Sequence, residues 1–355
     1  MTGRKRVDPY GFVCLVGKPQ RMEARPHHRF EGLSGRLTCR LTVKTPLFVY
    51  NPKFARPVGR GHEQATFPVY NGTAVIPGSS LKGVIRSVAE AVEASCFTLF
   101  GGPRYRGSGI TRGMQVQVEL PQGYEHCTRR DQLCPACRLF GFLHRGEVHA
   151  GKVHAGKVSI SDAVAPQGKY ELMDFIVLDV LSTPKPEART EVYVVRQGGR
   201  NVVRGRKFYR HRLDGVLTRA GGRKDRQNKT VRPVAPDSVF TLEVEYNDLR
   251  ESELRLLLYA LALEPGLWHK IGLGKPIGMG SAHIEIVAWQ RIDRVARYHT
   301  MGGGMDEPLE GDVLQEELDD WLRPYRESEA PNLQDLRELW RYEHEYDVRY
   351  ARPVQ

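Results

Sequence analysis

The chain has 355 residues, of which 40% are apolar, and it carries 53 Lys and Arg against 42 Asp and Glu, a net charge of +11. This apolar fraction suffices for one large domain or two, whereas the longest apolar run, the eight residues 256–263, is too short to cross a membrane. No apolar signal region follows the basic residues 1–6, and six cysteines in a chain this long predict no disulfide framework. We therefore expect a cytoplasmic protein.

The charge is unevenly distributed along the chain. Residues 184–236 contain 15 Lys and Arg against 4 Asp and Glu, whereas residues 306–347 contain 15 Asp and Glu against 4 Arg. A basic body with a denser basic segment is typical of a nucleic-acid-binding protein. The acidic segment is unsuited to RNA, so we expect it to pack on the basic body or on a neighbouring protein.

The first predicted elements are a strand, a loop and a helix. Residues 1–34 have few periodic apolar residues and form an N-terminal extension, with short extended pieces that can pair at a sheet edge. Residues 35–49 alternate between apolar side chains and basic or hydroxyl side chains, which predicts a half-buried strand. Residues 51–73 predict a long Pro- and Gly-rich loop. A helix over 80–95 follows, and the glycines at 101–102 are expected to end it.

The start of this helix has the chemistry of an anion site. Pro77-Gly78 predicts a turn, and Ser79 or Ser80 can cap the helix through a side-chain oxygen. Lys82 and Arg86 follow on the polar face. Because the N-terminus of a helix carries free N–H groups and partial positive charge, these side chains are candidate phosphate ligands. An ordinary capped surface helix is the alternative.

Three cysteines give the strongest chemical signal in the chain. In Cys127-x6-Cys134-x2-Cys137, the Cys-Pro-x-Cys turn directs two thiolates to one centre, and a third cysteine upstream fits a tetrahedral zinc site. Such an ion would be structural, holding residues 97–147 together. The alternative is three buried cysteines without a metal. A zinc deaminase needs His-x-Glu and Pro-Cys-x-x-Cys. We exclude it, because His62 and Glu63 are adjacent and the proline lies inside the Cys pair.

The fourth zinc ligand is open at this stage. Cys96, His126, His144 and His149 are all candidates by their position in the sequence. We prefer Cys96, because it lies at the exit of the predicted helix.

The basic segment combines cations with aromatic side chains. Residues 190–196 predict a strand, and residues 204–212 place two aromatic residues among six basic ones. This interleaving suits single-stranded RNA, whose bases stack on rings while its phosphates meet cations. We therefore expect Arg206, Lys207 and Tyr209 to bind RNA. A solvated hairpin is the alternative.

The remaining predicted elements complete a recognisable order. A strand over 152–162 precedes the basic segment, and a strand over 237–246, a helix over 248–263 and a strand over 281–289 follow it. Asp248 is the expected cap of this helix, with Glu251 three residues later. The order βαββαβ is that of a ferredoxin-like (RRM-like) core.

These elements predict an α+β fold with three parts. The core covers residues 35–290 and contains the zinc-knuckle insertion 97–147 and the basic, thumb-like insertion 184–236. Residues 291–355 form an acidic C-terminal extension with two amphipathic helical segments.

A glycine-rich loop directly precedes the last predicted strand. Residues 272–281 contain four glycines and one lysine, so the backbone can approach a phosphate closely. The loop matches neither a Walker motif nor a dinucleotide fingerprint. We expect Gly274, Lys275 and Gly278 to bind RNA, and the loop to converge in space with the start of the helix over 80–95.

Residues 76–83, 133–141 and 272–281, in this order, resemble motifs of the RAMP superfamily of CRISPR-associated proteins. The closest resemblance is to the backbone subunits of type III effector complexes, and it extends over about residues 35–290. It implies an RNA-binding subunit that holds guide RNA through its phosphates and helps to position target RNA. The implied partners are guide RNA, target RNA and other CRISPR effector subunits, with no role for a membrane.

The resemblance leaves catalysis open. Relatives that cleave target RNA are understood to use an aspartate in the loop after the first strand. Between Pro46 and Ser80 this chain has only one carboxylate, Glu63, next to His62. These two residues could act as base and acid, and Mg²⁺ would be needed only in that case. We favour a non-cleaving or weakly cleaving subunit. A metal-dependent endoribonuclease on the same scaffold and a stand-alone RNA-binding protein are the alternatives.

Overall fold

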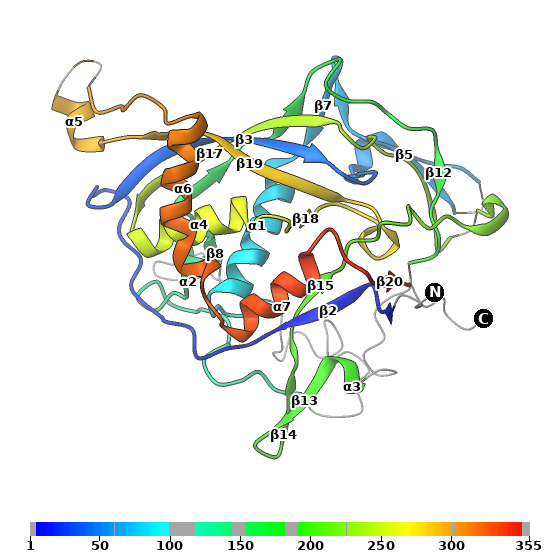
Figure 1. Ribbon diagram of the computed structural model, residues 1–355, viewed down its shortest axis with the longest axis horizontal. Helices are drawn as coiled ribbons and strands as arrows, with labels where there is room; N and C mark the ends of the chain where they lie inside the picture. The colour runs from blue at the N-terminus through cyan, green and yellow to red at the C-terminus, as the bar shows by residue number, and fades with distance from the viewer. Residues whose placement is uncertain are drawn as a thin grey trace.

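The computed structural model describes residues 5–59, 61–98, 118–143, 153–181, 190–224, 226–299, 301 and 303–349. It is a mixed α+β structure, as predicted, in which strands form a large twisted sheet and helices pack beneath one of its faces (Figure 1). Among the described residues, no helix is both long and apolar enough to span a membrane.

The helices are α1 (Gly78–Val92), α2 (Pro135–Phe140), α3 (Thr190–Tyr193), α4 (Glu251–Ala262), α5 (Arg294–His299), α6 (Gly311–Arg326) and α7 (Pro331–Trp340), with short 3-10 turns η1 (Pro52–Phe54), η4 (Ala220–Gly222) and η5 (Lys275–Ile277). The strands are β1 (Arg6–Val7), β2 (Tyr10–Cys14), β3 (Leu33–Val43), β4 (Ala55–Pro57), β5 (Glu63–Thr66), β6 (Val69–Tyr70), β7 (Thr73–Ile76), β8 (Gly141–Leu143), β9 (Val153–Ala155), β10 (Val158–Ile160), β11 (Ala163–Ala165), β12 (Ile176–Val177), β13 (Val194–Gln197), β14 (Arg200–Val203), β15 (Gly205–Tyr209), β16 (Lys229–Arg232), β17 (Val239–Leu249), β18 (His269–Lys270), β19 (Ser281–Arg291) and β20 (Asp347–Val348).

The main sheet has the order β18-β19-β3-β17-β11-β7-β6, and β10 also pairs with β17. β3 lies between β19 and β17 and is antiparallel to both. The alternation predicted for this strand is confirmed, because Leu37, Cys39 and Leu41 are buried while Arg36 and Arg40 face the solvent side, paired with glutamates of β17 and β19. The predicted strand over 152–162 is instead split into β9 and β10, and β11 follows it.

Helices α1 and α4 cover the inner face of this sheet (Figure 1). The apolar face predicted for α1 is confirmed at Leu81, Ile85 and Val88, which are buried. α1 ends at Val92 with Glu93 in an extended conformation, three residues before the predicted end at residue 95, and the glycines 101–102 lie outside the described residues.

Both predicted helix caps are wrong. Neither Ser79 nor Ser80 caps α1, and instead the backbone N–H of Gly78 donates to Asp162 Oδ1 at 2.8 Å. α4 begins after Arg250, whose backbone N–H donates to Glu253. Asp248 instead accepts bonds from the N–H groups of residues 31 and 32 and from Lys157 Nζ. At α1 a partner distant in sequence replaces the predicted local cap, whereas at α4 the cap is still local and moves from Asp248 to Arg250.

Two further segments differ from prediction. Residues 51–73 are not an irregular loop, since they form η1, β4, β5 and β6. β4 and β5 join β16 and β12 in a second sheet of order β12-β16-β5-β4. Residues 190–193 form the short helix α3 rather than the start of a strand, and only residues 194–197 are extended.

The basic segment and the N-terminal extension are joined. β15 pairs antiparallel with β2, so the predicted extended piece pairs with the basic segment rather than with the main sheet. β13 and β14 form a hairpin that projects from the body on the side away from the main sheet (Figure 1).

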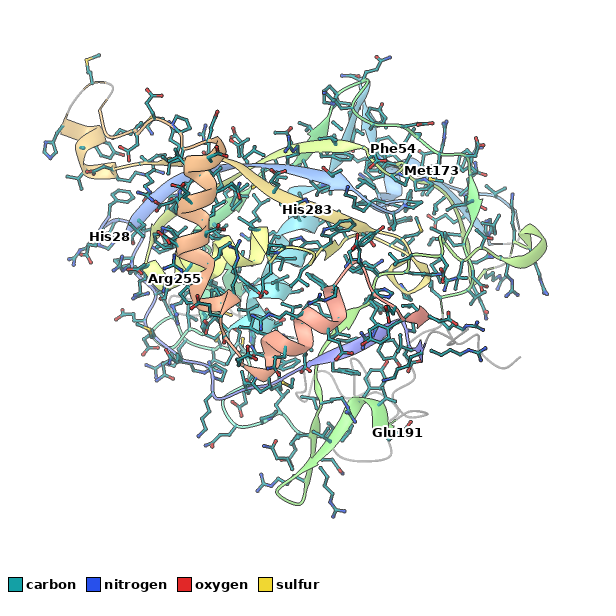
Figure 2. All side chains as sticks on the ribbon, viewed as in Figure 1. His28, Phe54, Met173, Glu191, Arg255 and His283 are labelled. Atoms are coloured by element: carbon teal, nitrogen blue, oxygen red, sulfur yellow. The ribbon has the colours of Figure 1, made fainter. Side chains whose placement is uncertain are left out.

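The acidic C-terminal extension packs on the body. This was one of its two predicted partners, the other being a neighbouring protein. α6 buries Leu314, Leu318 and Leu322 against α4 and β19. Arg255 of α4 lies beside α6 (Figure 2), with its guanidinium carbon 5.7 Å from the centroid of the Trp321 ring. In α7, Asn332 donates to the carbonyls of residues 91 and 92 and so satisfies the end of α1.

Candidate metal centre and nucleic-acid interface

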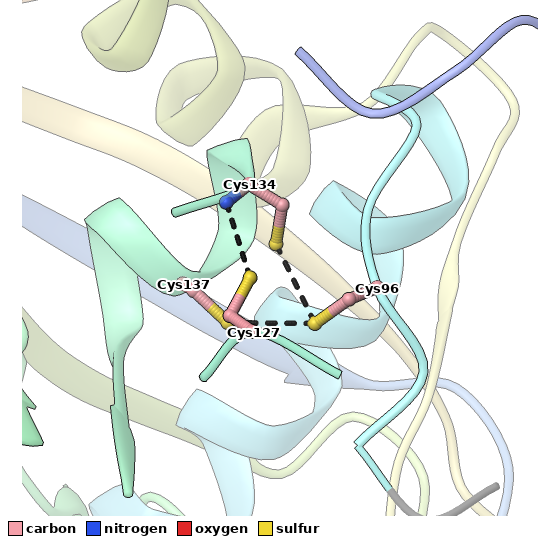
Figure 3. A group of neighbouring side chains, drawn as sticks. All are labelled: Cys96, Cys127, Cys134 and Cys137. Carbon is pink, nitrogen blue, oxygen red and sulfur yellow. Dashed lines mark hydrogen bonds between the residues drawn. The ribbon is translucent and has the colours of Figure 1, made fainter. Parts of the chain in front are cut away.

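Four cysteines from three segments meet in the interior. Cys96 follows α1, Cys127 lies in the loop before α2, and Cys134 and Cys137 belong to the first turn of α2 (Figure 3). All four are buried, and their sulfur atoms lie within 4.8 Å of one another. Cys96 Sγ is 3.6 Å from both Cys134 Sγ and Cys137 Sγ. A tetrahedral ion with metal–sulfur bonds of about 2.3 Å separates its sulfur ligands by roughly 3.8 Å, so the group fits one metal ion such as zinc.

This arrangement selects Cys96 among the four candidates for the fourth ligand. The ring of His126 packs against Phe142, with 6.5 Å between centroids, and His126 is not part of the group. His144 and His149 lie outside the described residues.

The local backbone positions the thiols. Pro135 occupies the first turn of α2, where its missing N–H costs nothing. The N–H of Cys134 donates to Cys127 Sγ at 3.3 Å, and the N–H of Ala136 donates to Ser95 Oγ at 3.2 Å. Hydrogen bonds from Cys127 and the other two thiols hold the pKa of Cys134 well below its usual range. A thiolate is the form that ligates a metal.

Two guanidinium groups contact the sulfur atoms. Arg21 donates to Cys127 Sγ at 3.1 Å and to the carbonyl of Gly123 at 3.0 Å. Arg86 donates to Cys137 Sγ at 3.4 Å and to the carbonyl of Gly141 at 2.9 Å. Arg86, predicted to bind RNA, is therefore part of the surroundings of the cysteines.

Arg206 is also engaged within the protein. Its guanidinium donates to Glu90 Oε2 at 2.6 Å and to the carbonyls of Ser95 and Cys96 at 2.7 and 2.9 Å. Glu90 accepts a second bond, of 2.8 Å, from Arg86. The structure thus brings together two of the cations predicted to bind RNA, but around a shared glutamate.

Lys207 and Tyr209 form an internal aromatic cluster. Lys207 Nζ lies 3.7 Å from the centroid of the Tyr10 ring and donates to Tyr193 Oη at 3.1 Å. Tyr209 packs edge-on against Tyr10, with 6.4 Å between centroids. Tyr209, which the sequence predicted to bind RNA, therefore belongs to a group of tyrosines around a lysine of the same chain.

The start of α1 already holds an anion. The carboxylate of Asp162 accepts the Gly78 N–H, and Ser79 is exposed while Ser80 is half-buried. Lys82 Nζ donates to the carbonyl of Val158 at 3.0 Å. Burial lowers the pKa of Lys82, with a smaller effect from Arg86.

The glycine-rich loop has a different character. Gly274 and Gly278 adopt left-handed conformations with φ of 78° and 103°, and a Cβ at Gly278 would lie 2.7 Å from a backbone oxygen. Burial lowers the pKa of Lys275. Within the described part of the chain, the Lys275 ammonium has neither a hydrogen-bond acceptor nor a carboxylate partner. It is a half-buried cation without a counter-charge.

Lys270 lies behind this loop. Its ammonium is buried and donates to the carbonyl of Met279 at 2.9 Å. Burial, with a smaller effect from the charge of Lys275, lowers the pKa of Lys270 to about 7. No sequence motif indicated this second lysine, which lies in the two-residue strand β18.

The predicted convergence of the helix start and the glycine loop is not observed as a single site. Lys82 bonds to β10, whereas Lys275 directly precedes β19, and β17 and β3 lie between these two strands. Three strand spacings amount to roughly 14 Å. This spacing favours two separate sites over one phosphate shared by Lys82 and Lys275.

His62 and Glu63 do not form an acid–base pair. His62 is buried, with its Nε2 atom 2.8 Å from Thr230 Oγ1. Glu63 instead accepts hydrogen bonds from Lys229 and Tyr50. Among the residues that the structure describes, the cysteine group is the only cluster able to hold a metal ion. Glu63 is therefore the carboxylate partner of Lys229 in this structure.

Comparison with known proteins agrees with the motifs. The family model of the RAMP superfamily matches residues 40–283, which is more than half of the chain. No curated protein matches the chain. The matched segment contains the cysteine group, the start of α1 and the glycine-rich loop.

Proposed function

Because the chain belongs to the RAMP superfamily, a family of CRISPR-associated proteins, we propose that it is an RNA-binding backbone subunit of a type III effector complex. In this role it holds guide RNA through the phosphates and helps to position target RNA, with other effector subunits as neighbours. Phosphate contacts set position and carry no base information, which suits a subunit that must accept guides of any sequence.

The proposed core is ferredoxin-like. The strand order β19-β3-β17-β10 supports it, since the first and fourth strands of the predicted βαββαβ unit lie side by side and the third separates the first from the second. α1 and α4 are then its two crossover helices. The cysteine region, the basic segment 184–236 and the C-terminal extension are additions to this core.

The observation that carries the RNA proposal is the glycine-rich loop. Lys275 is the half-buried cation without a partner described above, and the left-handed glycines on both sides of it form the tight turn that holds it. A phosphate supplies the missing counter-charge. We place the start of α1 outside the proposed surface, because the Gly78 N–H already donates to Asp162 and Lys82 already donates to the carbonyl of Val158.

The proposed metal is a structural zinc ion held by Cys96, Cys127, Cys134 and Cys137. Tetrahedral thiolate sites bind zinc or iron–sulfur clusters, and the 3.6 Å sulfur separations support a single ion. Zinc has no redox chemistry and stabilises loops that lack a large apolar core.

The test compares Lys275→Ala with wild-type protein in binding to two unrelated single-stranded RNAs over a range of salt concentrations. We expect weaker binding to both RNAs alike and a log–log salt slope that is smaller by about 0.7, the value for one phosphate contact on a single strand. Lys169→Ala, at an exposed turn lysine, is the control and should leave the slope unchanged. An unchanged slope in Lys275→Ala would overturn the assignment.

Target cleavage is tested separately. Purified effector complex is incubated with labelled target RNA and Mg²⁺. Intact target throughout supports the non-cleaving subunit, whereas cutting that is lost in Glu63→Ala would establish the nuclease alternative.

A further inference from the structure

Arg21, Arg86 and Arg206 lie nearest the cysteine group. Each of these arginines donates hydrogen bonds to a sulfur, a carboxylate or a carbonyl in or beside the group. We propose that Arg21 and Arg86 are the charge-compensating outer shell of the metal centre, and that Glu90 links this centre to Arg206, so that a bound divalent cation holds β15 against α1. The proposal assigns a role to residues that the RNA-binding function does not need, and it rests only on the cysteine site.

The charge balance supports the outer shell. Four thiolates and one divalent cation carry a net charge of −2, which is costly in a buried site unless nearby cations offset it. Arg21 and Arg86 supply two positive charges and donate directly to Cys127 Sγ and Cys137 Sγ. Glu90 and Arg206 add one charge of each sign. With four thiolates and a divalent ion bound, the whole group is neutral.

Arg21 ties the N-terminal extension to the centre. Its side chain reaches Cys127 from a segment more than a hundred residues away in sequence. The backbones of Met22 and Leu133 exchange two hydrogen bonds, of 3.0 and 2.8 Å, next to Cys134. Residues that orient or polarise metal ligands in this way commonly change metal affinity 10- to 100-fold when replaced.

Arg86, Glu90 and Arg206 form the link to the basic segment. Arg86 and Glu90 lie one turn apart on α1, and the Glu90 and Arg206 side chains are only 13% and 10% exposed. Arg206 also donates to the carbonyl of the ligand Cys96 and lies over the Phe97 ring, 4.2 Å from its centroid. β15 carries Arg206 and pairs with β2. Loss of the ion therefore loosens the contact that fixes this strand pair.

The first experiment measures the rate at which zinc-loaded full-length protein releases Zn²⁺ to a chromogenic chelator. Arg21→Gln and Arg86→Gln are expected to release the ion at least tenfold faster than wild type, and Arg86→Lys, which keeps the charge, less than threefold faster. The control is Arg129→Gln, since Arg129 lies in the same cysteine region, is 68% exposed and pairs only with Asp131. Wild-type release rates in both Gln variants would overturn the outer shell. Arg21→Gln gives this answer even where Arg86→Gln fails to fold.

The second experiment follows amide hydrogen exchange in β15 and β2 before and after chelation. Zinc removal should accelerate exchange at residues 205–209 and 10–14, while β3 and β17 stay protected. In the Arg206→Gln variant, the β15 amides should exchange rapidly whether or not zinc is present. Equal exchange of β15 in zinc-bound and zinc-free wild type would overturn the link. Neither experiment contains RNA, so failure here is distinct from failure of the proposed function.

Discussion

Two basic regions of this molecule use their cations in opposite ways. Around the cysteine centre, Arg21, Arg86 and Arg206 each donate to sulfurs, carbonyls or a shared glutamate. At the glycine-rich loop, Lys275 is half-buried and lacks such a partner within the described residues. The difference shows that the density of Lys and Arg in a segment does not tell which of its cations remain available to a ligand. The partners that each cation has in the folded chain do.

The largest expected effect concerns the cysteine centre, the first of the two regions compared. Cys137→Ser removes one metal ligand from a group that holds α2 and the end of α1 together. Metal content should fall well below one ion per chain, and the free energy of unfolding should decrease by several kcal/mol. Elemental analysis and urea denaturation measure both quantities. Cys14→Ser, outside the cluster, is the control. Full metal retention in Cys137→Ser would contradict the site.

The sequence predicted this centre well because its chemistry is local. Cys134 and Cys137 lie on one turn, and Cys127 lies seven residues upstream, so spacing alone indicates a shared ion. The surroundings could not be predicted in the same way. Arg21 and Arg206 reach the centre from distant segments, and no periodicity reports which acceptor a guanidinium will find after folding.

The same distinction applies to the fold. Strand β3 and helix α1 follow from alternation and helical spacing, which are local properties. The caps were predicted wrongly because Asp162 and Asn332, far away in sequence, satisfy the two ends of α1. The structure of residues 51–73 was missed since its short strands are specified by pairing with β16 and β7 rather than by their own composition.

The next effect compares the two basic regions directly. Arg206→Ala leaves Glu90 partly buried with one of its two cations removed, so we expect a loss of about 3 kcal/mol in the free energy of unfolding. Lys275→Ala removes no hydrogen bond or ion pair among the described residues and should leave that free energy within about 0.5 kcal/mol of wild type. Urea denaturation of the two variants gives both values. A larger loss of stability in Lys275→Ala than in Arg206→Ala would show that the cations have been assigned to the wrong regions.

Lys270 gives a pH-dependent effect at the glycine loop. Its pKa of about 7 in the folded protein lies below the unfolded value of 10.5, so folding releases a proton in the window between them. Stability should therefore rise with pH from about 7 towards 10.5, with a slope approaching 1.4 kcal/mol per pH unit. Lys270→Met should remove this contribution. Urea midpoints at pH 7 and pH 9 test it, and equal pH dependence in the variant and wild type would count against the shift.

The smallest expected effect concerns the start of α1, which the sequence also predicted to bind phosphate. Asp162→Ala removes the acceptor of the Gly78 N–H and should destabilise the protein by about 1 kcal/mol. Because we assign RNA binding to the glycine loop, RNA affinity should stay within about twofold of wild type in this variant and in Asp162→Asn, which keeps the acceptor oxygen but not the charge. A clear gain of affinity in both would mean that Asp162 competes with phosphate. Ser79, Ser80 and Lys82 would then return as candidate RNA ligands, even though the Gly78 N–H and Lys82 already have acceptors in the folded chain.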